Sequence, residues 1–325
     1  MPQIIEAYPP HVTTLAKLAL GSPTADTVYP TAAGTFLATT QLIDFAEFSN
    51  GISSQFADGN RNRGAFDRFK NRTRQSRLMI EPSLDAIPTV DEWNYLLSWI
   101  FGDTGSGTTT KTYKLKNNVG DQNHERNVQY SDGNGNTESF ACCAIKEAVI
   151  TTAGNENLVS LRASLSGRDY QTNVAFPSLS NLDNTKTPFV LPDSDLYITF
   201  NGSPILVENV SITISQAIDP NRNFNKLTQS RNVKTDRMVR VSFDYPDGGF
   251  PTLWNSAETG YAMVVKFVNG SYEMTFTFVD VRAAREPRRY GTRTEVKNTF
   301  NGMAYGTGTQ TQPLDDSLIA SIKLS

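Results

Sequence analysis

The sequence predicts a mainly β protein with two tandem β-sandwich or barrel-like domains, each carrying one short α-helix and one long polar loop. Three observations lead to this prediction: a period-two hydrophobic alternation, an internal repeat and one clear helical segment. The chain has 325 residues, of which 38% are hydrophobic and 10% aromatic. At roughly 100–200 residues per domain, this length favours two domains, each large enough to bury its own core.

Apolar and polar residues alternate along several segments. The segment 272–278 reads YEMTFTF and the segment 239–245 reads VRVSFDY. The segments 210–214 and 159–165 follow the same pattern. Because side chains along a strand point alternately to its two faces, this pattern indicates strands with one buried face.

An internal repeat divides the chain. The sequence DGNRN at 58–62 recurs as DPNRN at 219–223, and the dipeptide WN at 93–94 recurs at 254–255, with the same offset along the chain. Across 52–94 and its counterpart, nine of 43 positions are identical without a gap. Since the chain has only three tryptophans, the matched tryptophan makes a chance resemblance of two polar loops the weaker interpretation.

The repeat also has a matching end. Both copies finish on an alternating strand followed by G-x-x-Y, with Gly167 and Tyr170 in the first copy and Gly302 and Tyr305 in the second. The two G-x-x-Y segments lie closer together along the chain than the two copies of the DGNRN/DPNRN and WN motifs do. The first copy therefore carries an insertion, which we place in the segment 102–139.

These offsets define the expected domain organisation. The N-terminal domain spans 1–175 and begins with an extended arm, 1–34. The Pro-rich segment 176–195 is the expected linker, and the C-terminal domain spans 196–325.

One helix is predicted after residue 88. Thr89 and Glu92 have the spacing of a capping box, and Gly102 supplies a C-terminal stop. The residues expected on its buried face are Trp93, Leu96, Leu97 and Ile100. The matching segment 251–260 is expected to form a shorter helix that begins with Pro and contributes Trp254 to the second core.

No residue spacing predicts an active site. His11 and His124 stand in no metal-site or triad spacing, and the adjacent pair Cys142 and Cys143 is sterically unsuited to a disulfide. No apolar run approaches the ~20 residues needed to span a membrane, and the N-terminus lacks a signal-peptide pattern. We therefore expect a protein that is not an enzyme, uses no cofactor or metal and does not bind a membrane.

A basic loop in both copies predicts a docking surface. The loops span 58–77 and 219–237, and their flanks read as strands. Their predicted contact residues are Arg61, Arg63, Arg68, Lys70, Arg72 and Arg74 in the first copy, and Arg222, Lys226, Arg231 and Lys234 in the second. The partner could be an acidic protein surface or a phosphate backbone, and a solvated loop without a partner is the alternative. The net charge of −3 favours protein.

The two β domains, each with one helix and one long polar loop before a strand, resemble the tail tube (major tail) proteins of long-tailed bacteriophages. The resemblance covers nearly the whole chain from about residue 35 onward. It implies rings of six domains that stack into a hollow tube, with sheets lining the lumen and the long loop reaching an adjacent ring. A duplicated domain implies three chains per ring, in a pseudo-hexamer.

The resemblance also implies partners and a location. The partners are further copies of the chain, the tape measure protein, the tail terminator, distal tail or baseplate proteins, and DNA in transit. The location is the virion tail, assembled in the host cytoplasm. The expected lumen is acidic or neutral, because a basic lumen would retain DNA.

Two alternatives remain open at this point. One is a tail-completion or baseplate ring protein, which would form a single ring. The other is a carbohydrate-binding or hydrolytic β-sandwich protein, which would need a cleft with converging aromatic side chains or carboxylates.

Overall fold

A computed structural model describes residues 17–21, 39–58, 73–116, 125–153, 158–177, 186–191, 198–219, 233–246, 260–283, 297–307 and 315–324. Within these ranges there are nineteen strands and one helix, which confirms the mainly β fold class. The N-terminal half contains β1 (Lys17–Gly21), β2 (Thr39–Ile43), β3 (Glu47–Ser49), β4 (Ile52–Asp58), β5 (Thr73–Ile80), β6 (Ser83–Ala86), α1 (Val90–Phe101), β7 (Thr110–Lys114), β8 (Glu125–Ser131), β9 (Thr137–Ala153), β10 (Leu158–Ser166) and β11 (Asp169–Thr172). The C-terminal half contains β12 (Ile198–Phe200), β13 (Ser203–Pro204), β14 (Asn209–Asp219), β15 (Val233–Pro246), β16 (Tyr261–Asn269), β17 (Tyr272–Ala283), β18 (Lys297–Tyr305) and β19 (Ile319–Lys323).

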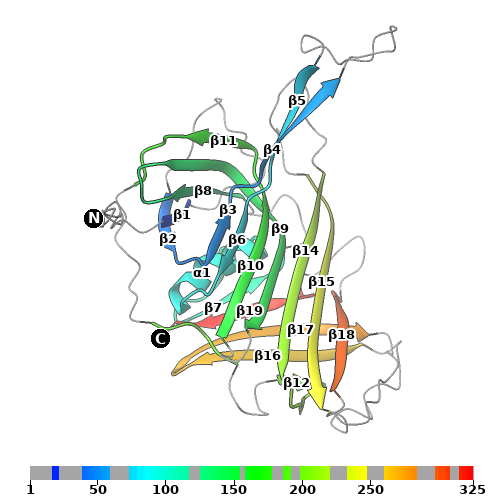
Figure 1. The fold of residues 1–325 in the computed structure, drawn as a ribbon. Coiled ribbons are helices and arrows are strands. Elements are labelled where there is room, and N and C mark those ends of the chain that lie inside the picture. The colour runs from blue at the N-terminus through cyan, green and yellow to red at the C-terminus, as the bar shows by residue number, and fades with distance from the viewer. Residues whose placement is uncertain are drawn as a thin grey trace, which may run out of the picture.

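Seventeen of these strands belong to one continuous sheet, while β4 and β5 form a separate two-stranded sheet. In Figure 1, β14 and β15 run alongside β9 and β10, and β16, β17 and β19 cross beneath them. The long alternating segments predicted from the sequence at 239–245 and 272–278 form β15 and β17, each with its apolar side chains buried. The alternation therefore identifies these strands correctly.

Strand pairing joins the two halves of the chain at two places. β9 pairs with β14, where Ile150 lies opposite Ile212, and β7 pairs with β19, where Tyr113 lies opposite Ala320. β7 and β8 both lie within the predicted insertion 102–139. The buried hydrophobic side chains of both halves form one cluster, so the halves share a core where the sequence predicts one core each.

The two strand hairpins that flank the basic loops coincide at one residue pair. Phe56 of β4 pairs with Gln75 of β5, and Ala217 of β14 pairs with Asp236 of β15. These are equivalent positions of the sequence repeat on both strands. Each hairpin also contains a one-residue register shift next to this pair. Such bulges bend a hairpin and increase its twist. The two shifts lie on opposite sides of the shared pair, so the other pairs of the two hairpins differ in register by one residue.

The G-x-x-Y segments have matching pairing too. The Gly167 amide donates to the Ile80 carbonyl at 2.8 Å, and Gly302 pairs with Val241. Ser83 pairs with Ser164, and Asp244 pairs with Thr299. These pairs are equivalent in the sequence repeat. In the first copy, one residue of each pair precedes the insertion in the sequence and the other follows it.

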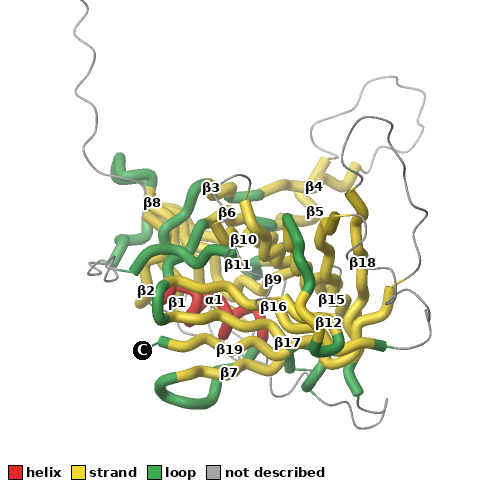
Figure 2. Tube along the Cα trace, turned by 90° about the horizontal axis from the view of Figure 1, so that it is seen from below, coloured by secondary structure: helices red, strands yellow, loops and turns green. Residues whose placement is uncertain are grey.

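The helix α1 forms where the sequence predicts it. Both bonds of the capping box between Thr89 and Glu92 are present, and Gly102 ends the helix with a φ of 66°. The four residues of the predicted apolar face, Trp93, Leu96, Leu97 and Ile100, are buried. Figure 2 shows α1 inside the arrangement of strands. The predicted second helix, with Trp254, lies outside the described residues.

Residues 186–191 of the predicted linker pack between the two halves. Phe189 is fully buried, and its carbonyl accepts a hydrogen bond from the Val159 amide at 2.9 Å. Val190 exchanges two backbone hydrogen bonds of 3.0 Å with Val268 of β16. This stretch therefore packs as part of the core.

Candidate assembly interface

The stems of both basic loops are described, and their tips are not. Arg74 lies on β5 and Lys234 lies on β15, but their side chains are outside the described part of the structure. The other eight predicted contact residues, Arg61, Arg63, Arg68, Lys70, Arg72, Arg222, Lys226 and Arg231, also lie outside it. The strands β4 and β5 extend away from the large sheet (Figure 1).

The two stems differ in what they lie against. β14 sits between β15 and β9, with five residue pairs to β9 running from Ser211–Thr151 to Ser215–Glu147. Among the described strands, β4 pairs with β5 alone. The second stem is therefore anchored to β9 through residues 211–215, while the first stem presents a strand edge.

A polar cluster holds the second stem at Arg237, in the part of the stem nearer the loop. The Arg237 guanidinium donates to the Lys116 carbonyl at 2.6 Å, and the Lys116 ammonium lies 3.3 Å from an Asp315 carboxylate oxygen. Burial lowers the pKa of Arg237 to about 10, and the Asp315 charge partly offsets this effect. Arg237 is the last basic residue of the predicted loop 219–237, and its contacts are structural. No sequence spacing could identify partners 121 residues away.

A buried ion pair connects the insertion to the first G-x-x-Y segment. The Arg168 guanidinium donates to one Glu125 oxygen from both Nε, at 2.9 Å, and Nη2, at 2.5 Å, and both side chains are at most 2% exposed. Cys142 is buried nearby, and desolvation raises its pKa to about 11, which keeps the thiol protonated and unreactive. The second repeat has Met303 at the position of Arg168.

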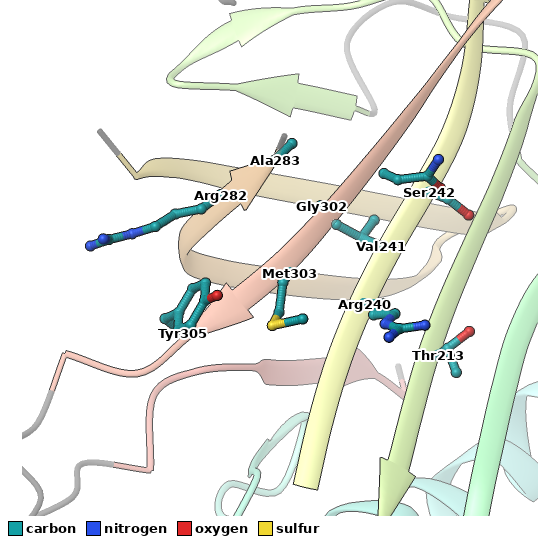
Figure 3. A pocket seen from close by; sticks show the side chains of 10 residues that line it. Thr213, Arg240, Val241, Ser242, Arg282, Ala283, Gly302, Met303 and Tyr305 are labelled. Carbon is teal, nitrogen blue, oxygen red and sulfur yellow. The ribbon is translucent and has the colours of Figure 1, made fainter. Parts of the chain in front are cut away.

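A hollow of about 780 Å³ opens on the C-terminal half, between β14, β15, β17 and β18. Arg282 and Tyr305 lie on one side of it, and Arg240 and Thr213 on the other (Figure 3). The Arg282 guanidinium is held by Asp280 at 2.8 Å and lies over the Tyr305 ring. The described residues that line the hollow include no carboxylate, histidine or cysteine, so the lining offers no acid–base pair.

Two further searches cover only the described ranges. Within them, no cluster of His, Cys, Asp and Glu side chains could hold a metal ion. No helix among the described elements is both long and apolar enough to cross a bilayer.

The chain matches no protein-family model, and no curated protein is significantly similar to it in sequence.

Proposed function

We propose that the chain is a structural subunit of a bacteriophage tail tube. Three chains would form a pseudo-hexameric ring, and rings would stack around a lumen that holds the tape measure protein and conducts DNA into the host. The tail terminator and the distal tail or baseplate proteins would close the two ends. The virion tail is the corresponding location, and the role requires no enzymatic activity.

The pairing of β9 with β14 is the main observation behind the proposal. It makes one sheet continue from the N-terminal half into the C-terminal half through backbone hydrogen bonds. A ring of repeated domains needs a junction of this kind at each domain boundary, because closure of a sheet on itself removes its edges. The recurring pairing at the two G-x-x-Y segments supports the view that the halves are equivalent units.

Fusion of two units in one chain also suits ring assembly. Every second domain boundary is then intramolecular, which raises the effective concentration of the contacting strands. The shared core, the buried linker residue Phe189 and the β7–β19 pairing would make that boundary permanent. Only the boundaries between chains would then have to form during assembly.

Negative-stain electron microscopy of the purified full chain tests the proposal. Long hollow tubes of uniform width are the expected result. Isolated rings that never stack would instead favour a tail-completion or baseplate ring protein. Dispersed monomers at high protein concentration would contradict both roles and reopen the carbohydrate-binding or hydrolytic alternative.

A further inference from the structure

At Ile52, the backbone N–H and C=O groups of β4 point away from β5. The Glu81 amide donates to the Gly51 carbonyl at 3.1 Å, so that carbonyl faces the β5 side. In a trans peptide the N–H points opposite to the C=O, so the Ile52 amide faces the other way. The alternation of an antiparallel pair then places the Ser53 amide toward β5.

The matching position in the C-terminal half is Ile212. Ile52 pairs with Ile80, the partner of Gly167, and Ile212 pairs with Val241, the partner of Gly302. This structural equivalence differs by a single position from the alignment of the sequence repeat, because the register shifts in the two hairpins are not at the same pair.

In the C-terminal half, that edge is occupied by β9. The Val210 amide donates to the Thr152 hydroxyl at 3.2 Å, and the Val210 carbonyl accepts from the Thr151 hydroxyl at 3.1 Å. Since every second residue of a strand points the same way, the backbone groups of Ile212 also face β9, opposite Ile150. The edge of β14 that joins the two halves at Ile212 therefore corresponds to the edge that β4 presents at Ile52.

We propose that the edge of β4 around Ile52 docks an antiparallel strand of a second molecule of this chain, in the way that β14 docks on β9. This inference rests on the proposed function and assigns the contact between neighbouring chains of a ring. An exposed edge with its N–H and C=O groups directed outward is a template for strand addition.

The internal pairing also sets the symmetry of this contact. β14 meets β9, which is a different strand in a different half, and not a second copy of itself. The contact between molecules is therefore head-to-tail, and head-to-tail contacts form rings when the rotation closes.

The variant Ile52→Pro tests the inference in the full chain. Proline removes the outward amide and places its ring on the docking edge. The pairing of β4 with β5 does not use this amide, because the neighbouring Ser53 amide points toward β5. The matched control is Ile52→Ala, which loses a similar amount of side chain but keeps the amide. We expect the critical concentration for assembly to rise about tenfold or more in Ile52→Pro relative to Ile52→Ala. Far-UV circular dichroism checks that both variants are folded.

Hydrogen exchange on the wild-type chain gives a second measurement that needs no variant. The Ile52 amide should exchange at least about tenfold more slowly in assembled protein than in dissociated protein, while the Ser53 amide is slow in both. Equal assembly of the two variants together with unchanged exchange at Ile52, in a wild type that forms rings, would overturn the inference and leave the proposed function standing. A wild type that forms only symmetric dimers through β4 would also overturn it. Absence of any wild-type assembly would instead reject the proposed function.

Discussion

Gly167 and Gly302 explain the G-x-x-Y pattern at the scale of single residues. A Cβ atom on Gly167 would lie 2.8 Å from the Ile80 side chain, and one on Gly302 would lie 2.5 Å from the Val281 side chain. Both distances are well inside van der Waals contact. At the same point in both repeats, a side chain would therefore force the neighbouring side chains to shift.

We predict that Gly167→Ala and Gly302→Ala each lower the free energy of unfolding by about 1–3 kcal/mol, because the added methyl group overpacks the site. Urea denaturation measures the change. The control Ser164→Ala lies shortly before Gly167 at a half-buried position of β10, and it should change stability much less. If either glycine variant is as stable as the wild type, the close approach is not what selects glycine there.

Glu92 is a second residue whose role extends beyond its own helix. Its carboxylate accepts the Thr89 amide at 2.7 Å, within the capping box, and the Asp44 amide at 2.6 Å, from the loop after β2. Burial raises the pKa of this carboxyl, while the two amide bonds oppose that shift. The sequence predicts the first contact from its capping-box spacing, but the second joins residues 48 positions apart and leaves no local pattern.

We expect Glu92→Ala to destabilise the protein by about 2–4 kcal/mol, because two buried backbone donors lose their acceptor. The matched variant Glu92→Gln keeps one acceptor oxygen and should lose less. Thermal unfolding followed by tryptophan fluorescence reports both. Equal stability of the alanine variant and the wild type would show that water replaces the carboxylate at both amides.

At the scale of elements, local patterns predict strands well and their partners poorly. Alternation identifies β10, β14, β15 and β17, because each has one face on the core. It does not show that the insertion supplies β7 as a partner for β19, since this pairing joins segments that lie far apart in the sequence. The ion pair of Arg168 with Glu125 was missed for the same reason.

The position of β19 between β17 and β7 predicts that the two halves unfold together. Ile322 of β19 is fully buried, and it pairs with Met274 of β17 and with Lys111 of β7. We predict that Ile322→Ala lowers the free energy of unfolding by about 2–5 kcal/mol and that unfolding stays a single transition. Calorimetry checks both statements. The control Ser321→Ala faces the other side of the strand and should have little effect. Two separate transitions would show that each half is an independent folding unit.

At the scale of the whole molecule, the basic loops and the β4 edge would serve different contacts. The edge near Ile52 lies at the base of the first stem, where a neighbour in the same ring would dock. The loop 59–72 begins at the far end of the same stem, which extends from the body (Figure 1). A loop carried at that distance could reach an adjacent ring. Ring formation and ring stacking should therefore be separable by mutation.

We predict that a variant with Arg61, Arg68, Arg72 and Arg74 replaced by Ser still forms rings but assembles poorly into tubes. Its loop would lose the positive charge that docks on an acidic surface of the next ring, and the wild-type contact should itself weaken with added salt. Negative-stain microscopy counts rings against tubes over a salt series. The control variant removes four exposed positive charges from the strands of the body, at Lys17, Lys114, Arg162 and Lys323, and should form tubes as the wild type does. Tubes of normal length in the loop variant would exclude a stacking role for these arginines, whereas loss of rings and tubes together would place the loop at the contact within the ring.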